Sequence, residues 1–519
     1  MKLEQPNWNT ETYLEFINSR LSKHGLWVGW LILLAMVCLI HSLTLTISPP
    51  LWGDEVQIIE HGRIIPFQPN SEWSMNWWSR ANRPILLWSY LGPALQEGAF
   101  KITMPLPTGP RVASLLGAMM AATTSVGWLL AMKTYRPVAL VLGLIFLLDP
   151  IFVPSYRGGR VDCWALAVCF GSCWVLRRAM SRMENGRPFR WVLMLAGSLA
   201  SVAFFILPSA VLTYPLVLAE LTALFWEGRR MKSGASALPS LAAFAVGGLA
   251  MASVMFIPIR HLLKDVLYDV QPILSASQPP YSFWIQVKAF LDSLKYSQLL
   301  PVGALIGFIC GRGRVILYMA LFAFVYVFST RLYPGRLIYL LPYAIGLIGA
   351  ACRVPLSFNS KTCRVVTQVG LAMVLMTSVS SSLIIRPVVA LDQKREREPG
   401  VLFKLGSESI GDGPHRIYLG AWEFYFVGRK LGWHMFHEYV DQDQTNLSTI
   451  LSSVDYAIFY SGDVNGELDL TLSNAGLRLS KVLVDDRQHL AGVNHQFSPA
   501  TKLYGPYRLY SRQPAPDGL

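Results

Sequence analysis

Long apolar stretches recur along most of the chain, and many of them approach the length that crosses a bilayer. They predict a mainly α-helical, polytopic transmembrane bundle of about eleven spans. The expected spans lie near Leu26–Ile47, Arg111–Met132, Pro137–Pro154, Val161–Leu176, Trp191–Leu207, Ser209–Trp226, Ala237–Ile259, Gln298–Cys310, Val315–Thr330, Leu337–Ala351 and Val365–Ile385.

Basic residues gather in the short segments between alternate spans, at 177–190, 229–232, 312–314 and 353–364. This is the positive-inside pattern of membrane proteins, in which Lys and Arg mark the cytoplasmic loops. It explains much of the net charge of +13 without a nucleic-acid partner. Only 15% of the 519 residues are charged, whereas about 25% is typical of soluble domains.

The same charges predict an orientation. With Arg20 and Lys23 inside, the first span places the segment 48–110 on the outer face. An odd number of spans places the chain after Arg386 there as well. We therefore expect a multi-pass protein of the cytoplasmic (inner) membrane, with a transmembrane domain at 1–386 and an outer loop at 48–110.

The region 387–519 differs in character. Its segments "RIYLGAWEFYFVG", "DYAIFY", "LRLSKVLV" and "YRLYSR" are typical of short strands, and "TNLSTILSSV" of a helix. We expect a small, soluble, extracytoplasmic α/β domain, joined to the bundle by the charged stretch "LDQKREREPG".

Two adjacent acids, Asp54 and Glu55, follow the first span directly, in "LWGDEVQ". A carboxylate beside apolar residues at a bilayer edge is poorly solvated, which favours a functional role such as a general base. The alternative is an acidic pair that only stabilises a helix N-terminus. Arg63 follows at helical spacing and extends the same polar face.

Two further polar groups lie where predicted spans meet the outer face. In "SYRGGRVDCWALA", Arg160 and Asp162 either hold an anionic substrate or form an interfacial ion pair. In "TRLYPGRLIYLLPYAIG", Arg331, Tyr333 and Arg336 suit a phosphate at headgroup depth, the alternative being arginines that extend into the interface. Glu220 lies inside a span near its basic end, where it would extend to the interface or mark an ion path.

In this order, the motifs resemble the glycosyltransferase-C (GT-C) superfamily, in particular its protein O-mannosyltransferase and lipid A aminoarabinose transferase group. "DE" in "LWGDEVQ" follows the first span as in that group, and "YRGGRVDCWALA" is similar to its "xRPDAL" motif. "NRPILLWSYLGPALQEGAF" resembles "HPPLYY", "GPRVASLLGAMM" resembles "RLPSAL", and "PGRLIYLLPYAIG" more loosely resembles "RYLLPLLP". Two positions depart from these patterns: Asn82-Arg83 replaces a histidine, and Val161 replaces the proline of "RPD".

The resemblance implies transfer of a sugar from a polyprenyl-phosphate donor to a hydroxyl of a glycan, lipid or protein acceptor at the outer face. It implies Asp54 as the base, Glu55 beside it and Asp162 as a second acid. Arg160 would pair with Asp162 or contact the phosphate. With the arginines and the tyrosine already named, Arg83 completes the candidate set for the substrate and its lipid phosphate.

A single displacement, with phosphate as leaving group, would invert the anomeric carbon and needs no nucleophilic residue. We expect no cofactor and no metal, although Asp54, Glu55 and His61 could together hold a cation. Two other classes remain open. A secondary transporter would carry repeated halves and ionisable residues near the midplane. A non-catalytic membrane scaffold of cell-envelope assembly would use the C-terminal domain to bind a partner.

Overall fold

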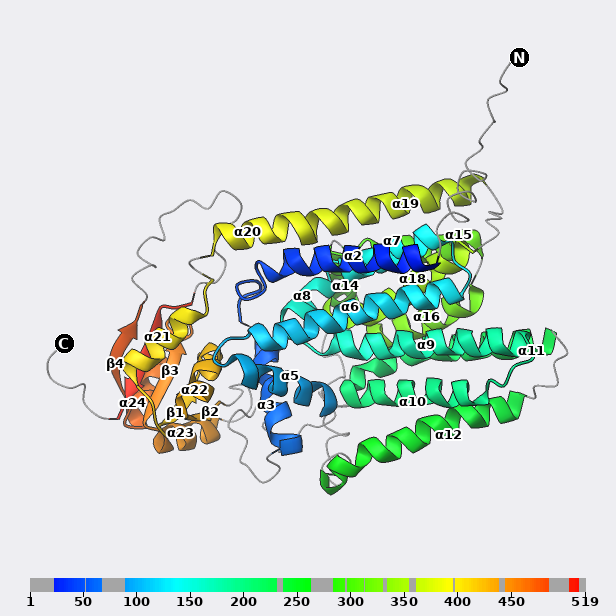
Figure 1. Ribbon diagram of the computed structural model, residues 1–519. Coiled ribbons are helices and arrows are strands. Elements are labelled where there is room, and N and C mark those ends of the chain that lie inside the picture. The colour runs from blue at the N-terminus through cyan, green and yellow to red at the C-terminus, as the bar shows by residue number, and fades with distance from the viewer. Residues whose placement is uncertain are drawn as a thin grey trace, which may run out of the picture.

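The computed structural model describes residues 23–51, 53–67, 89–230, 237–262, 283–294, 296–311, 313–329, 334–353, 361–394, 397–437, 444–484 and 504–512. Most long helices lie side by side along one direction, and a small α/β domain lies beyond one end of them (Figure 1). We call this end of the bundle the sheet end, and the other end, where the basic residues Arg182, Arg187 and Arg230 lie, the basic end.

The bundle begins with α2 (Lys23–Ser42) and two helices at the sheet end, α3 (Gly53–Phe67) and α5 (Leu91–Thr103). Its remaining elements are α6 (Thr108–Ala131), α7 (Arg136–Leu147), α8 (Phe152–Arg157), α9 (Asp162–Glu184), α10 (Arg190–Ile206), η1 (Pro208–Thr213), α11 (Tyr214–Arg230), α12 (Ala237–Phe256), η2 (Ile257–Leu262), α14 (Phe283–Leu294), α15 (Leu299–Cys310), α16 (Arg314–Ser329), α17 (Pro334–Leu337), η3 (Ile338–Leu340), α18 (Leu341–Ala351), α19 (Lys361–Val379), the π-helical η4 (Ser380–Ile385) and α20 (Arg386–Asp392).

Six helical segments within the described residues are long and apolar enough to cross a membrane. They are Gly25–Ser42, Thr108–Ala131, Asp162–Glu184, Pro208–Arg230, Leu238–Arg260 and Val365–Asp392. Shorter apolar helices occupy the other expected spans, at Arg136–Leu147, Arg190–Ile206, Leu299–Cys310, Arg314–Phe328 and Gly335–Ala351. The protein is therefore an integral membrane helix bundle, while the count of about eleven crossings stays a prediction.

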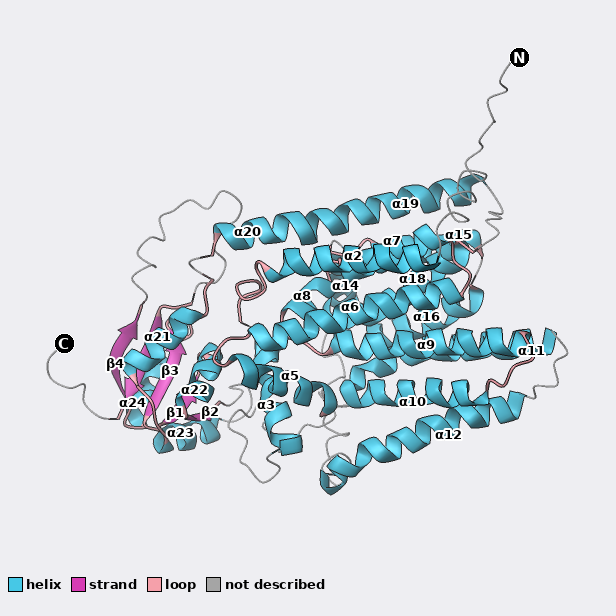
Figure 2. Cartoon of the chain, viewed as in Figure 1, coloured by secondary structure: helices cyan, strands magenta, loops and turns pink. Residues whose placement is uncertain are grey.

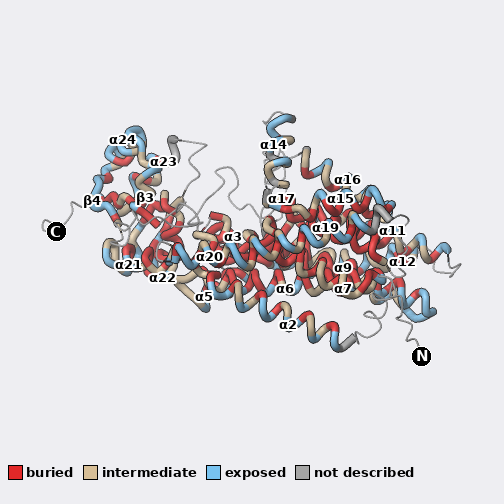
Figure 3. Tube along the Cα trace, turned by 90° about the horizontal axis from the view of Figure 1, so that it is seen from above, coloured by how far each residue is buried: buried red, intermediate tan, exposed pale blue. Residues whose placement is uncertain are grey.

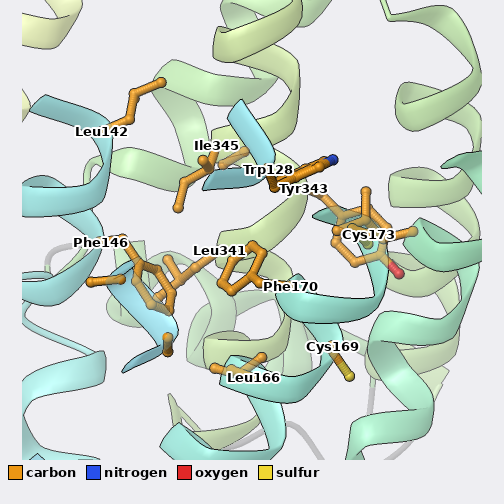
Figure 4. Packing of buried hydrophobic residues seen from close by; sticks show 14 of the residues in the cluster. Trp128, Leu142, Phe146, Leu166, Cys169, Phe170, Cys173, Leu341, Tyr343 and Ile345 are labelled. Atoms are coloured by element: carbon orange, nitrogen blue, oxygen red, sulfur yellow. The ribbon is translucent and has the colours of Figure 1, made fainter. Parts of the chain in front are cut away.

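The bundle core is built from aromatic and aliphatic side chains of α6, α7, α9 and α18 (Figure 4). The Phe170 ring lies with its centroid 5.7 Å from that of Trp128 and 5.3 Å from that of Phe146. Figure 3 shows burial concentrated along these central helices. By contrast, only 11% of the apolar window of α12 is buried, and α12 packs mainly on α10, as expected of a helix that faces lipid.

The C-terminal domain contains a five-stranded mixed sheet of order β2-β1-β3-β5-β4 (Figure 2). β1 pairs in parallel with β2 and β3, and β5 pairs antiparallel with β3 and β4. The strands are β1 (Arg416–Leu419), β2 (His434–Phe436), β3 (Tyr456–Tyr460), β4 (Arg478–Leu483) and β5 (Tyr507–Ser511), and the helical elements are α21 (Gly400–Ser409), η5 (Trp422–Phe424), α22 (Tyr425–Leu431), α23 (Gln444–Ser453) and α24 (Gly466–Asn474).

Strands occur in all four segments where we expected them, and α23 is the expected helix. The segment "RIYLGAWEFYFVG" is a strand only over Arg416–Leu419, and its remainder forms η5 and the start of α22. The short strand expected in this segment is therefore confirmed, and it covers only the first four residues of the segment. Gly432, which has φ 78°, lies directly after α22 and ends it, because a left-handed residue cannot continue a helix.

The C-terminal domain shares a hydrophobic cluster with the first loop. Leu51, Val56 and Ile59 lie in this cluster with Phe100 of α5 and the buried face of α22 and its sheet. The Phe100 and Phe426 rings meet edge to face, with centroids 5.3 Å apart. The C-terminal domain and the loop that carries Asp54 therefore lie at the same end of the bundle.

Candidate functional site

Asp54 lies in the first turn of α3, next to Glu55. Two prolines, at 49 and 50, separate this helix from the end of α2, and acidic residues favour a helix N-terminus because the backbone N–H groups there carry partial positive charge. The side chain of Asp54 is 28% exposed, whereas that of Glu55 is fully buried. The two adjacent acids therefore have different environments.

Arg160 joins Asp54 to Asp162. Its Nη1 forms an ion pair with Oδ2 of Asp54, and its Nε lies 2.8 Å from Oδ2 of Asp162. The structure thus brings together three of the predicted site residues, from α3, the turn before α9 and the first residue of α9. Arg160 therefore pairs with the carboxylate of a distant element as well as with the one two residues after it.

Asp162 is fully buried and accepts hydrogen bonds at both oxygens. Ser155 Oγ donates to Oδ2 over 3.0 Å, and the Tyr339 hydroxyl donates to Oδ1 over 2.6 Å. A buried charge is costly unless it is paired and hydrogen-bonded, and Asp162 satisfies both conditions. Its carboxylate is positioned to fix Arg160.

Gly159 shapes the turn before Arg160. It adopts φ +67°, and a Cβ added there would lie 2.9 Å from Cγ of Glu55. Only glycine combines this backbone conformation with such a close approach. The double glycine of "YRGGRVD" thus lets the turn pack directly against the first residues of α3.

Glu55 forms a bidentate ion pair with Arg111 of α6. The distances are 2.7 Å from Nε to Oε1 and 2.9 Å from Nη2 to Oε2, and both side chains are fully buried. Arg111 Nη1 also donates to the carbonyl oxygens of Leu45, Thr46 and Pro49. This pair therefore fixes the chain between α2 and α3 to α6.

Arg157 secures the same connection from the other side. Its Nε donates to the Ser48 carbonyl over 2.9 Å, and Nη2 donates to the Thr44 carbonyl over 2.8 Å. Its Nη1 lies 2.7 Å from Nδ1 of His41. Arg157 is fully buried and thus positions the polypeptide rather than facing an open site.

Arg63, a predicted phosphate-binding residue, lies in a polar network between α3 and the C-terminal domain. Its Nη2 is 2.5 Å from Oε1 of Glu60, whose Oε2 accepts a 2.5 Å hydrogen bond from Tyr425. Arg429 donates to the Tyr425 hydroxyl over 2.8 Å and pairs with Glu97 of α5 over 2.6 Å. Burial raises the pKa of Tyr425 well above its usual value, so its hydroxyl remains a donor.

Of the other predicted binding residues, the structure describes Arg336. Arg336 is half-buried in α17, three residues before Tyr339, whose hydroxyl contacts Asp162. Arg83, Arg331 and Tyr333 lie outside the described residues. Among the residues that the structure describes, no three His, Cys, Asp or Glu side chains gather as a metal-binding group.

Sequence reasoning missed Arg111, Tyr339 and the pair Tyr425–Arg429. Arg111 stands inside a quoted motif, "GPRVASLLGAMM", and a buried arginine near the start of a span requires a carboxylate partner, which was the available signal. Tyr339 lies one helical turn after Arg336, so its position beside the site could also have been inferred from the sequence. The sequence around Tyr425 and Arg429 does not indicate that these residues contact α3 or α5.

The sequence matches no protein-family model and no curated protein sequence. Among solved structures, ArnT from Cupriavidus metallidurans bound to undecaprenyl phosphate is similar, with a TM-score of 0.58 at 11% identity, over 94% of this chain and 99% of that one. Its apo form gives a TM-score of 0.56 with the same coverage.

The arabinofuranosyltransferase AftD from Mycobacteria is similar to 96% of this chain over 40% of its own length, with a TM-score of 0.53 at 15% identity. These likenesses extend over the bundle and the C-terminal domain together. The family resemblance stated from the motifs is thus confirmed at the level of the fold. The chain therefore shares its fold with ArnT and AftD, and this is the fold that the resemblance of the motifs to the glycosyltransferase-C superfamily implies.

Proposed function

We propose that this protein transfers a sugar from a polyprenyl-phosphate donor to an acceptor hydroxyl, with Asp54 as the general base. The observation that carries the proposal is the contact of Arg160 with both Asp54 and Asp162. It supports a preorganised site, because a partly exposed carboxylate is held by a guanidinium that is itself fixed from behind. The undecaprenyl phosphate bound to ArnT, a protein of the same fold, supports the donor class.

In the proposed reaction, Asp54 accepts the proton of the acceptor hydroxyl while that oxygen attacks the anomeric carbon of the donor. The bond from this carbon to the phosphate oxygen breaks, and its electron pair leaves with the polyprenyl phosphate. A proton acceptor placed within hydrogen-bond distance of the hydroxyl contributes about 10²–10⁴-fold to the rate. One displacement inverts the anomeric carbon, and analysis of the product anomer tests this.

Asp162 and Glu55 would have positioning roles in this reaction rather than the catalytic ones that the family resemblance implies. Both are fully buried, and each is hydrogen-bonded through both carboxylate oxygens. Asp162 would set the position of Arg160, and Glu55 would hold the first turn of α3 against α6. Asp54, at 28% exposure, is the member of the three that an acceptor can approach.

The leaving phosphate needs positive charge at headgroup depth. We assign this role to Arg336, which lies next to the segment that contacts Asp162, and to Arg83, Arg331 and Tyr333 on sequence grounds. Guanidinium groups suit it because they bind phosphate in a bidentate manner. Arg63, which is paired with Glu60, would instead hold α3 to the C-terminal domain.

The acids of the proposed site lie at helix ends rather than near the middle of the bundle, which favours an enzyme over a transporter. The positive-inside pattern would place this end, and the C-terminal domain with it, on the extracytoplasmic side. The acceptor would then be a glycan, lipid or protein exposed on that side.

The experiment is complementation of a strain that lacks the gene, with mass analysis of surface glycans and of polyprenyl-linked sugars. Asp54→Asn is expected to lose the product and to accumulate the donor, because the amide cannot accept the proton. Asp412→Asn, at an exposed position of the C-terminal domain, is the matched control and should retain the product. Full transfer by Asp54→Asn, with normal membrane levels of both variants, would overturn the proposal.

A further inference from the structure

A cavity of about 1100 Å³ opens at the basic end of the bundle, among α2, α6, α9, α11 and α16. It is remote from the candidate site. Asp162 begins α9, whereas Arg178, which lines the cavity, lies sixteen residues further along it. At 1.5 Å per residue, this places the two about 24 Å apart along the helix axis.

The described lining of this cavity is strongly cationic, with seven Lys and Arg side chains against two Glu. The sequence clusters at 177–190, 229–232 and 312–314 each contribute to it. Besides Arg177, its basic members are Lys133, Arg136, Arg178, Arg230, Arg314 and Arg353. In the folded chain, basic residues from several sequence clusters therefore lie around one cavity.

One of the arginines that line the cavity is neutralised by a buried carboxylate. Arg177 forms an ion pair with Glu220, and the indole Nε1 of Trp128 donates to Oε1 of the same carboxylate over 3.1 Å. Glu220 is buried and paired, so the expectation that it extends to the interface is wrong. Because this carboxylate is occupied by Arg177, it does not neutralise the remaining cations.

Tryptophans line the same cavity. Trp27, Trp174 and Trp226 line the cavity, and Trp226 is 72% exposed. The guanidinium of Arg178 lies 5.4 Å from the Trp174 ring centroid. Tryptophan rings beside arginines at the ends of transmembrane helices mark the headgroup region of a bilayer.

We propose that this cavity binds the phosphate headgroup of an anionic phospholipid in the leaflet opposite the transfer site. A concave space at headgroup depth, lined by arginines from several helices, binds such headgroups because each guanidinium adds charge-assisted hydrogen bonds to phosphate oxygens. A lipid there would link α2, α6, α9, α11 and α16, and the proposal is independent of the transfer reaction.

The test uses the purified full-length protein in a nonionic detergent, with binding of phosphatidylglycerol followed by native mass spectrometry. The variant Arg178→Gln/Arg230→Gln/Arg314→Gln removes three lining charges at exposed positions. Arg182→Gln/Arg187→Gln/Arg229→Gln removes three charges outside the lining at the same end and is the matched control. We expect at least about a tenfold loss of affinity in the first and less than about twofold in the second.

Phosphatidylcholine and inorganic phosphate serve as the other two ligands. Weak binding of phosphatidylcholine, and no displacement of phosphatidylglycerol by inorganic phosphate, are the expected results. Equal losses of affinity in the two triple variants would show that binding depends only on net charge, and this would overturn the proposal. Tight binding of inorganic phosphate alone would identify a soluble anion instead and overturn it as well.

A second measurement does not depend on the variants. Lys133 is an exposed residue of the lining, and Lys404 is an exposed residue of the C-terminal domain. Phosphatidylglycerol should slow the acetylation of Lys133 severalfold and leave that of Lys404 unchanged. Equal rates at Lys133 with and without this lipid would contradict binding in the cavity.

Discussion

Arg160, in the turn before α9, forms an ion pair with Asp54, which lies 106 residues earlier in the sequence. The contact connects the first loop to the helix that crosses the centre of the bundle. The same guanidinium is bound on its other side by Asp162. The position of Asp54 therefore depends on a residue that is itself fixed inside the protein.

Arg160→Lys should test this dependence. An ammonium group is compact and cannot reproduce the fork of donors that reaches two carboxylates. We expect kcat to fall by about tenfold or more, with a smaller change in KM, because Asp54, the proposed base, is displaced while charge is retained. Arg182→Lys, at the basic end, should leave kcat unchanged. Equal kinetics for the two variants would show that the bridge does not position Asp54.

Tyr339→Phe removes the 2.6 Å hydrogen bond to Asp162. A hydrogen bond to a charged group contributes about 1.5–3 kcal/mol, so the free energy of unfolding and kcat should both decrease. Tyr343→Phe is the matched control, because the Tyr343 hydroxyl donates to the backbone carbonyl of Leu212 over 2.7 Å. We expect it to lower the midpoint of thermal unfolding slightly and to keep kcat. Loss of kcat in both variants would indicate general damage to the bundle.

Glu55→Gln should destabilise the protein strongly. It leaves the fully buried Arg111 guanidinium without its carboxylate, and breaking a buried ion pair by removing one partner costs about 3–5 kcal/mol. Thermal unfolding in detergent measures the effect, and Asp463→Asn, at an exposed position, should not change it. An unchanged unfolding midpoint for Glu55→Gln would contradict the structural role assigned to this pair.

Gly159→Ala combines two unfavourable effects, a left-handed backbone and a contact of 2.9 Å with Glu55. Gly186→Ala isolates the first of these, because Gly186 has φ +65° with nothing within 4 Å of an added Cβ. The control should lose about 1–2 kcal/mol of stability and retain activity. Gly159→Ala should lose more stability, and kcat as well, since α3 must shift. Similar behaviour of both variants would argue against a tight approach of this turn to Glu55.

The helical bundle could be predicted from apolar length and basic clusters, because membrane insertion imposes a strong constraint on both. Asp54, Arg160 and Asp162 could be identified as polar groups at helix ends, with the family resemblance giving them a common site. Their mutual geometry could not, since a contact over 106 residues depends on how the helices pack.

Other features depend on tertiary packing, which the local sequence does not indicate. The aromatic run at 422–426 favours a strand, but it forms η5 and the start of α22 because Phe424, Tyr425 and Phe426 fill the cluster shared with α3. The pairing of Glu55 with Arg111 is likewise a property of the folded bundle. It buries Glu55, while the adjacent Asp54 stays partly exposed.

The backbone N–H of Leu51 donates to the hydroxyl of Tyr504, a residue that the ribosome adds 453 positions later. The segment leading into α3 therefore cannot form this contact until Tyr504 has been synthesised. Since chains emerge from the N-terminus onward, a prematurely terminated product would contain Asp54 and every long apolar helix but lack this support. The loop that carries Asp54 thus reaches its final packing only after synthesis has passed Tyr504, and chains terminated before that residue would lack the hydrogen bond at Leu51.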